Sequence, residues 1–458
     1  MGFSDRPLIG KINRFLASPG YILALMAISM AAHLLALELW AYTAFACIVV
    51  YSCLVAKDAL PVAPLFLFAY ILPSAGNNPG QNEASIFASP WFFALASAVA
   101  LSFLIFLVRN GKRIFRSKKL LLPGIYALCA AYLLSGIGSA AYPAALSQNL
   151  TIATLHGLCL VLPYLLLLGG SDWTKVRKDY LSWIGLCAGC LLVFEILLTF
   201  LRGGVIVEGV IDRKKIFTGW GMYNNMGVML AMMIPFTFSL TRHYKKDWLG
   251  LLTGGVFLLG VILTCSRTSM VAALGIYGVC TLFLLLKSPN RKQALWSIGG
   301  LFALAALAVV LFREPLLQLY SAFLAKLTDP SSRHVIFAKG WEQFTASPVF
   351  GTSFFSPGLS KAWDFSTLDS FSATFPPRWH NTLVQLLASC GIIGIAAYAF
   401  HRIQTVRLFL RSKNPHRLFM ACSILTLLVC SLLDCHFFNL GPVLFYTVIL
   451  VFTEAQTE

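Results

Sequence analysis

The chain has 458 residues, of which 58% are hydrophobic and only 12% are charged. Soluble proteins carry about 25% charged residues, so this composition excludes a soluble globular protein and predicts one that crosses a membrane several times. Most of the basic residues behind the net charge of +17 lie in short segments between apolar runs, where they suit anionic lipid head groups. Membrane lipids are therefore expected partners, and nucleic-acid binding is excluded.

Fourteen apolar segments approach the length that crosses a bilayer as a helix. They lie at about 21–38, 40–56, 59–73, 91–109, 120–139, 151–170, 181–201, 222–241, 249–264, 269–287, 294–312, 381–400, 418–434 and 437–453. The second and third are short, so twelve spans is the alternative. The expected fold class is an all-α integral membrane protein, a polytopic helical bundle with one long loop that contains an amphipathic helix.

The basic residues predict which side of the membrane each loop occupies. About 24 of the 35 Lys and Arg fall on the side that holds the N-terminus, as the positive-inside rule requires of the cytoplasmic side. Both termini are therefore expected to be cytoplasmic. Along the chain we expect N-terminal spans at 1–200, a core of spans at 201–312, an outer loop at 313–379 and C-terminal spans at 380–458.

The remaining basic residues gather on the outer side, against the insertion bias. They include Arg202, Arg213 and Lys214 after the seventh span, Arg267 alone in the tight turn TCSRTSM, and Arg333 and Arg378 in the long outer loop. Arginine presents a planar fork that matches phosphate. The pattern therefore predicts an anionic ligand, and solvated loop charge is the alternative for any single lysine.

The long outer loop is expected to contain a helix at about 332–345. The apolar residues that share one face of this helix are Ile336, Phe337, Trp341 and Phe344. Arg333 lies at its beginning. Such a helix would lie against the membrane-embedded part of the chain.

The end of this loop leads into the next span. Pro376 and Pro377 force an extended backbone, after which a helix is predicted to begin at about His380. The positive end of the helix dipole disfavours imidazolium. His380 would then be mostly neutral near neutral pH, with a ring nitrogen free to accept a proton. The alternative role for His380 is that of a capping or interfacial polar residue.

Neither the cysteines nor the acidic residues indicate a metal or a cofactor. Almost all of the 12 cysteines lie inside apolar spans, where cysteine behaves as a small hydrophobic residue. The acidic residues of the long loop are widely spread, without the spacing of a divalent-metal site. We therefore expect a metal-independent site without a cofactor.

Several segments carry a recognisable pattern in a fixed order. They are GWGMYNNMGVMLAMMIPF at 219–236, SRTS at 266–269, SRHVIFAKGWEQFTASPVFGTSFF at 332–355 and HNTLVQLLASCGIIGIAAY at 380–398. The pattern is an asparagine-containing span, a Ser-Arg turn, an arginine opening an amphipathic helix that ends in a Pro-x-x-Gly turn, and a His-Asn pair before a Gly-Ile-Ile-Gly helix. It resembles the shared core of the O-antigen ligase and O-antigen polymerase superfamily, over roughly residues 200–400.

The resemblance implies a glycosyltransferase of the bacterial inner membrane with its active site on the periplasmic side. The donor would be a glycan on undecaprenyl diphosphate, and a ligase would use a sugar hydroxyl of lipid A–core as acceptor. Transfer would be inverting and metal-independent. By resemblance, Arg267 and Arg333 would hold the diphosphate and His380 would act on the acceptor hydroxyl. Further candidates for substrate binding are Arg202, Arg213, Lys214, Asn225, Arg378 and Trp379.

Two alternatives remain open. The first is an O-antigen polymerase or a protein O-oligosaccharyltransferase of the same superfamily; RGGVIVEGVIDR at 202–213, with an arginine at each end of an outer loop, keeps the polymerase open as an alternative. The second is a polysaccharide or lipid transporter, which would require ionisable residues in the middle of the membrane. Glu195, His156 and Asp434 are candidates for that role.

Overall fold

The computed structural model describes residues 7–73, 89–116, 119–140, 142–207, 210–212, 215–218, 221–287, 291–311, 333–354 and 379–457, with scattered positions between 313 and 324. The chain divides into two compact units, each discontinuous in sequence. Unit 1 comprises Met1–Gly111, Gly170–Pro330 and Pro415–Thr426, and unit 2 comprises Lys112–Gly169, Ser331–Asn414 and Leu427–Glu458.

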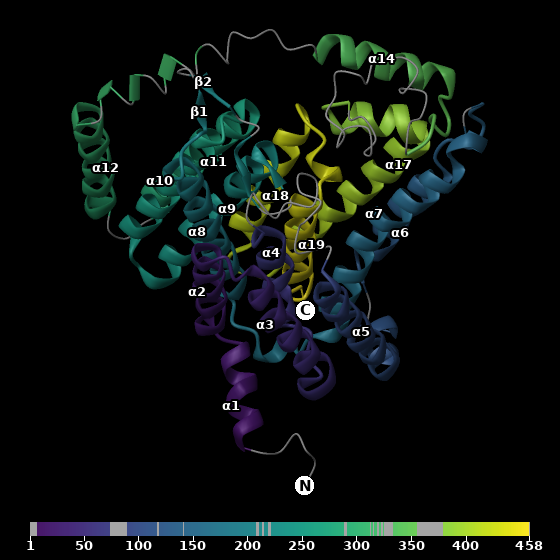
Figure 1. Cartoon of the computed structure of the whole chain (residues 1–458), viewed down its shortest axis with the longest axis horizontal. Coiled ribbons are helices and arrows are strands. Elements are labelled where there is room, and N and C mark those ends of the chain that lie inside the picture. Colours follow the sequence, from purple (N-terminus) through teal and green to yellow (C-terminus); the bar gives the residue numbers. More distant parts are fainter. Residues whose placement is uncertain are drawn as a thin grey trace. The chain divides into compact units, whose positions relative to one another are not determined.

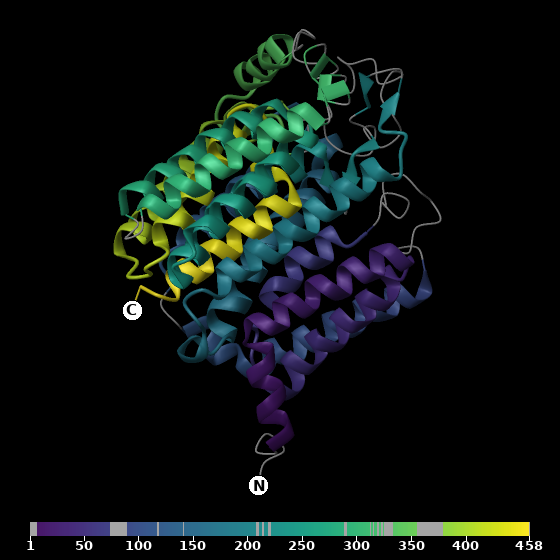
Figure 2. The same cartoon turned by 90° about the vertical axis from the view of Figure 1, so that its left-hand side faces the viewer.

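Unit 1 is organised around one central helix, α9 (Tyr223–Tyr244). Its other helices are α1 (Pro7–Leu16), α2 (Pro19–Leu35), α3 (Glu38–Tyr51), η2 (Ser52–Ala56), α4 (Val62–Ile71), most of α5 (Pro90–Arg116), η5 (Trp173–Lys175), α8 (Tyr180–Leu201), α10 (Asp247–Leu263), α11 (Arg267–Lys287) and α12 (Arg291–Leu311). Residues 226–241 of α9 are all buried, because α8, α10 and α11 pack around it (Figure 2). A helix covered on every side is expected to be apolar all round, as this segment is apart from Thr237, Ser239 and Thr241, whose hydroxyls are hydrogen-bonded.

Unit 2 is organised around α17 (Thr382–Arg411). Its other helices are α6 (Leu122–Leu134), α7 (Tyr142–Gly170), α14 (Arg333–Ala346), η8 (His436–Phe438) and α19 (Leu440–Glu454), while α18 (Arg417–Ser431) begins in unit 1 and ends in unit 2. Helices α6, α14 and α19 all contact α17 (Figure 1). The unit thus surrounds the helix that follows the predicted histidine.

All fourteen expected spans contain a helix. Among the described residues, 6 helices are long and apolar enough to cross a membrane, or 7 if α1 and α2, bent by 74° at their junction, count as one span. Helices α4, α6, α10, α18 and α19 are apolar but shorter, with 10–17 residues. The several long apolar helices confirm a membrane protein, and the number of crossings stays a prediction.

The described part of the chain is helical as predicted, apart from two short hairpins made of two-residue strands. Strand β1 (Ile206–Val207) pairs antiparallel with β2 (Val210–Ile211), and β3 (Phe217–Thr218) pairs antiparallel with β4 (Gly221–Met222). Both hairpins lie in the connection between α8 and α9. The β-branched residues on either side of the Glu-Gly pair at 208–209 favour a strand–turn–strand. The sequence analysis placed residues 202–213 in an outer loop and assigned no strand to them.

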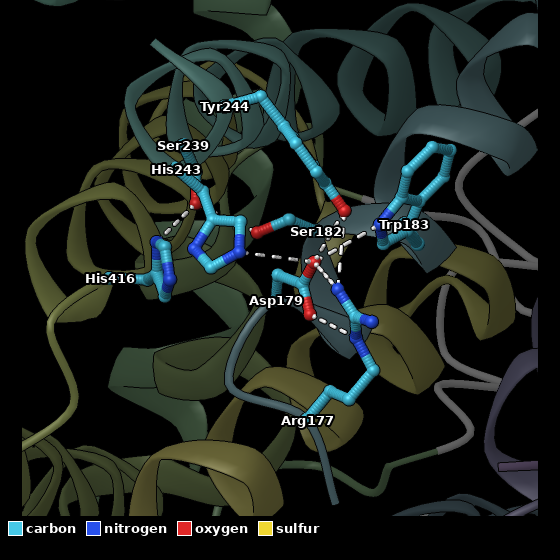
Figure 3. Close-up of polar contacts among 8 residues, drawn as sticks. All are labelled: Arg177, Asp179, Ser182, Trp183, Ser239, His243, Tyr244 and His416. Carbon is cyan, nitrogen blue, oxygen red and sulfur yellow. Dashed lines mark hydrogen bonds and ion pairs between the residues drawn. The ribbon is translucent and has the colours of Figure 1, made fainter. Parts of the chain in front are cut away.

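A polar cluster in unit 1 joins the beginning of α8 to the end of α9 (Figure 3). Asp179 is buried and accepts hydrogen bonds from Arg177 Nε and Nη2 at 2.9 and 2.8 Å. The hydroxyl of Tyr244 and the indole N–H of Trp183 also donate to this carboxylate, at 3.1 and 3.3 Å. Because these donors come from α8, α9 and the segment before α8, Asp179 fastens the three together.

The same cluster also holds the start of α18. Ser239 Oγ lies 2.7 Å from Ser182 Oγ and 2.8 Å from His416 Nδ1 (Figure 3). His416 is 5% exposed. The imidazole is therefore a structural group, buried between helices of unit 1.

His416 is expected to make the fold sensitive to acid. Burial, followed by the nearby His243, lowers the pKa of His416 to about 4, whereas an unfolded histidine titrates near about 6.5. Between these two pKa values the imidazole binds a proton in the unfolded chain but not in the folded chain. The free energy of unfolding therefore decreases as the pH falls through this window. The melting temperature of the purified protein in detergent should fall accordingly, and less steeply for His416→Gln. His334→Gln, which removes an exposed imidazole, is the control; equal flattening in both variants would contradict the assignment.

Candidate functional site

The turn before α17 places His380 at the N-terminal end of that helix. Asn381 caps the helix, because its side-chain oxygen accepts hydrogen bonds from the N–H groups of Leu383 and Val384 at 2.8 and 3.1 Å. The helix therefore begins at Thr382, and the capping role considered for His380 belongs to its neighbour. His380 precedes the cap with φ 49°, in the left-handed region that histidine occupies more often than most residues.

Trp379 anchors this turn from one side. It is 1% exposed and packs against Ile336 and Ala388, and its backbone N–H donates to Gln385 Oε1 at 3.1 Å. A direct contact between Trp379 and substrate would require the ring to leave this packing. In the structure its contribution is to hold His380 in a left-handed conformation that costs free energy when nothing restrains it.

His380 pairs with Asp434, which follows α18. Nδ1 of His380 lies 3.2 Å from Oδ1 of Asp434, and the backbone N–H of Cys435 donates to the same oxygen at 2.7 Å. The side-chain amide of Asn381 donates to the carbonyl of Leu432 at 2.7 Å. This second bond ties the two segments together and keeps the histidine opposite the carboxylate.

The electrostatics of the pair favour an ionised carboxylate. Burial alone would raise the pKa of Asp434, but the imidazoles of His436 and His380 and the N–H of Cys435 outweigh burial, and the pKa lies well below its ordinary value. A carboxylate only accepts hydrogen bonds, so Nδ1 of His380 donates and Nε2 remains as the acceptor. The His380 side chain is 41% exposed. An accessible imidazole oriented by a carboxylate is suited to general-base chemistry.

The predicted helix of the long loop is confirmed as α14, which begins at Arg333. Ile336 and Phe337 face α17, where they pack with Trp379 and Val384. The backbone position of Arg333 is thus set by a helix that contacts the His380 turn, while its side chain lies outside the described residues.

The buried face of α14 is narrower than the apolar face predicted from the sequence. The sequence predicts Trp341 and Phe344 on the face that packs inward, but Trp341 is 59% exposed, and its ring lies tilted against that of Phe344 with centroids 5.1 Å apart. The reason is helical geometry: at about 100° per residue, Trp341 lies roughly 140° around the helix from Ile336. It therefore sits at the edge of the buried face.

The turn after α14 clasps the middle of α17 through backbone hydrogen bonds. The N–H of Thr352 donates to the carbonyl of Ala388, and the N–H of Ile392 donates to the carbonyl of Pro348, both at 2.9 Å. Gly391 has non-helical φ and ψ inside α17, which frees backbone groups that a regular helix would use itself. The clasp fixes the half of α17 that carries the His380 turn.

Glycine is required on both sides of this clasp. Gly351 and Gly391 have φ values of 70° and 63°, which disfavour residues with a Cβ. A Cβ on Gly351 would collide with the backbone of Ser389, and one on Gly391 would collide with the carbonyl of Val349. The Pro-x-x-Gly turn and the first glycine of the Gly-Ile-Ile-Gly helix are therefore two halves of one contact.

Arg267 begins α11 in unit 1, directly after the tight turn at 264–266. The residues around it are buried and hydroxyl-bearing: Thr264, Ser266 and Ser269, with Ser266 Oγ 2.9 Å from Ser269 Oγ. A helix N-terminus disfavours a cation and attracts anions. An arginine at this position is consistent with an anionic ligand, which both the guanidinium and the helix end would stabilise.

Asn225 lies in the first turn of α9, in the same neighbourhood as the Arg267 turn. Two residues further on, Gly227 packs so closely that a Cβ there would lie 2.9 Å from Thr264 Oγ1 and 3.0 Å from Ser269 Cβ. Unit 1 therefore brings the beginning of α9 to the beginning of α11. The two helix starts that carry the predicted site residues Asn225 and Arg267 therefore lie side by side.

The remaining residues predicted to bind substrate are Arg202, Arg213, Lys214 and Arg378. Arg202 follows α8, and its Nη2 donates to the backbone carbonyl of His33 at 3.3 Å. Arg213, Lys214 and Arg378 lie outside the described residues. Their roles stay predictions.

The residues considered for a transporter have separate surroundings. In unit 1, Glu195 Oε1 lies 3.6 Å from His33 Nδ1. In unit 2, His156 packs against the ring of Phe354 with centroids 5.5 Å apart, while Asp434 pairs with His380. The sequence alone missed this last partnership, because the predicted span at 418–434 includes Asp434 whereas α18 ends at Ser431. The polar stretch DCH at 434–436, between two apolar runs, is the signal that points to it.

Asp434 lies between two imidazoles, since His436 Nε2 is 3.9 Å from its Oδ2. Two histidines and one carboxylate also form common metal sites. Within the part of the chain that the structure describes, however, no group of three His, Cys, Asp or Glu is placed to hold a metal ion. The interactions that the structure shows among these three residues are the His380–Asp434 hydrogen bond and the Asp434–His436 charge contact.

Comparison with known protein families connects these residues to an enzyme family. The family model Wzy_C, described as O-antigen ligase, matches residues 252–399. This segment contains Arg267, Arg333 and His380 and ends before Asp434. A comparison with curated proteins gives no match. With its several long apolar helices, the chain is therefore a multi-pass membrane protein, and its segment 252–399 is similar to the O-antigen ligase superfamily, whose members are membrane glycosyltransferase-like enzymes.

Proposed function

We propose that the chain is an O-antigen ligase of the bacterial inner membrane. It transfers a glycan from undecaprenyl diphosphate to a sugar hydroxyl of lipid A–core on the periplasmic side, with both termini in the cytoplasm. The observation that carries the proposal is the pairing of His380 with Asp434 at 3.2 Å, at the accessible start of a helix inside the family-matched segment. A hydroxyl acceptor needs a base, and this pair supplies one.

In the proposed reaction, Nε2 of His380 accepts the proton of the acceptor hydroxyl as its oxygen attacks the anomeric carbon. The bond from that carbon to the phosphate oxygen breaks, and the lipid diphosphate leaves with the bonding electrons. Attack opposite the leaving group inverts the anomeric centre. Asp434 holds the Nδ1 proton and stabilises the imidazolium that forms. A base of this kind contributes about 10²–10⁴-fold to the rate.

The leaving diphosphate gains negative charge as the glycosidic bond breaks. We propose that Arg267 and Arg333 bind this diphosphate, as the resemblance implies, and that they stabilise it more in the transition state than in the ground state. The position of Arg267 at the start of α11 supports this role. The mechanism uses no metal and no cofactor.

Substitution by lysine tests the arginines. If they bind phosphate through the two parallel bonds of the guanidinium fork, lysine keeps the charge and loses the geometry. We expect Arg267→Lys and Arg333→Lys each to lose transfer activity by about 10²–10³-fold, with normal protein levels in the membrane. Lys361→Ala, which removes a charge that the sequence predicts in the outer loop, is the control and should be nearly silent. Wild-type activity in both lysine variants would refute diphosphate binding by these residues.

A deletion strain distinguishes the ligase from its alternatives. A ligase mutant is expected to lose the whole O-antigen ladder on lipopolysaccharide gels while keeping polymer on undecaprenyl diphosphate. Lipopolysaccharide carrying single repeats would identify a polymerase, and absence of polymer from the periplasm would identify a transporter. Complementation with the wild-type gene and with His380→Asn shows whether the phenotype depends on the proposed base.

A further inference from the structure

A second, buried imidazole lies on the far side of Asp434 from His380. His436 follows two residues after Asp434, in the short helix η8, and is 1% exposed. Its Nε2 lies 3.9 Å from Asp434 Oδ2, whereas His380 Nδ1 lies 3.2 Å from Oδ1. The carboxylate thus faces an accessible imidazole with one oxygen and a buried imidazole with the other.

A neighbouring amide fixes which nitrogen of His436 carries the proton. Nδ2 of Asn439 lies 3.4 Å from Nδ1 of His436. An amide nitrogen only donates, so Nδ1 is the acceptor and the proton resides on Nε2. The N–H of His436 therefore points toward Asp434.

Two aromatic anchors hold His436 in this place. Phe437 packs on Tyr398 and Tyr446, with ring centroids 5.5 Å from each. Phe438 packs on Tyr132 and His156, with centroids 6.1 and 5.5 Å away. Because both following residues are buried, the imidazole cannot turn away without disturbing the core of unit 2.

Charged and titratable side chains from several helices of unit 2 lie around η8. Arg402 of α17 lies over the ring of Phe437 at 4.5 Å, Tyr446 comes from α19, and Tyr132 and His156 come from α6 and α7. Among the described residues, Asp434 is the carboxylate that lies within 4.0 Å of His436. Its interaction with His436 is therefore the one that bears on the catalytic pair.

We propose that His436 is a positioning residue for the His380–Asp434 pair. Its Nε2–H faces Oδ2, turns Oδ1 toward His380, and draws part of the carboxylate charge away from that histidine. The inference rests on the proposed function, because it assumes that His380 acts as the base. At 3.9 Å the contact is longer than a hydrogen bond, but charge–dipole interactions are strong in a buried, low-dielectric site.

A direction for the pH dependence follows. With both imidazoles sharing the carboxylate, His380 feels less than its full charge. Removing His436 concentrates that charge on His380, which then holds a proton to higher pH and is less often free to act as a base. The acid limb of the pH–rate profile should therefore move to higher pH.

The test measures the pH–rate profile of the full-length purified enzyme, with an undecaprenyl diphosphate-linked oligosaccharide as donor and lipid A–core as acceptor. We expect His436→Leu to lower the rate by about three- to tenfold at acid pH, as a shift of half to one pH unit requires, and to match the wild type at alkaline pH. His436→Gln, whose amide N–H can take the place of Nε2–H, should restore the wild-type profile. His243→Leu is the matched control, because it removes an imidazole that lies 3.9 Å from a different carboxylate, that of Asp179, and it should leave the acid limb in place.

The outcomes distinguish failure of the positioning role of His436 from failure of the proposed base, His380. An unmoved acid limb in His436→Leu, or no restoration by His436→Gln, would overturn the positioning role and leave the proposed function intact. A wild-type enzyme without any acid limb would remove the base itself, and the positioning role with it. If His436→Leu does not fold, Asn439→Leu replaces it in the test. This variant removes the amide that donates to Nδ1 of His436, and it should also move the acid limb to higher pH. An unmoved acid limb in Asn439→Leu would equally overturn the positioning role.

Discussion

His380→Asn is expected to lower the rate of glycan transfer by about 10²–10⁴-fold while the protein stays folded in the membrane. The amide has no basic nitrogen to accept the proton of the acceptor hydroxyl. Asparagine tolerates the left-handed conformation found here, φ 49°, better than most residues do, so the turn and the Asn381 cap should persist. The measurement is the initial rate of transfer to lipid A–core by the purified variant, together with its melting temperature.

Two further observations separate a base from a structural residue at this position. Donor binding should be retained, because the diphosphate is proposed to bind the arginines. The wild-type rate should also fall at acid pH, as the imidazole takes up a proton. His334→Asn, an exposed histidine of α14, is the matched control. A His380→Asn enzyme with near-normal rate, in a protein whose wild-type profile is flat in acid, would show that the chemistry depends on other groups.

Asp434→Asn should reduce kcat nearly as far, by about 10²–10⁴-fold, with little change in KM. The amide of this variant can donate to Nδ1 of His380, which selects the tautomer with its proton on Nε2. That tautomer cannot take a proton from the acceptor, although the geometry of the pair is kept. Steady-state kinetics with varied acceptor concentration separate kcat from KM.

The control for this variant is Asp172→Asn, which removes a partly exposed carboxylate that pairs with Lys175 at 2.8 Å. It should leave both kinetic parameters close to wild type. Equal kcat in wild type and Asp434→Asn would mean that the carboxylate does not set the tautomer of His380, and the proposed pair would then be a packing feature.

Much of the fold is predictable because long apolar runs have few ways to satisfy their backbone in lipid. All fourteen expected spans contain a helix, and α14 begins at Arg333, one residue from the expected start. The tight turn is also found where predicted, at 264–266, although Arg267 begins helix α11 and does not lie within the turn. These features depend on periodicity and on strong local signals, both of which a single sequence carries.

The arrangement around His380 is less predictable, for two physical reasons. Its partner Asp434 is 54 residues away, so the contact depends on how α17 packs against the segment after α18. The helix start is decided by competition between adjacent polar residues. Asparagine is among the best N-caps, and the preference for Asn381 over His380 follows from that ranking once the two are compared.

The glycines at 351 and 391 restrict which sequences can share this architecture. Any added carbon meets main-chain atoms on the opposite side, so no change of rotamer in a neighbour relieves the collision. Neither position can vary on its own while the clasp is kept. Homologues that retain this arrangement should therefore carry both glycines, and those that have lost one should have lost the other. Such joint loss in an alignment would mark a lineage that holds the turn around His380 by different means, whatever its overall identity.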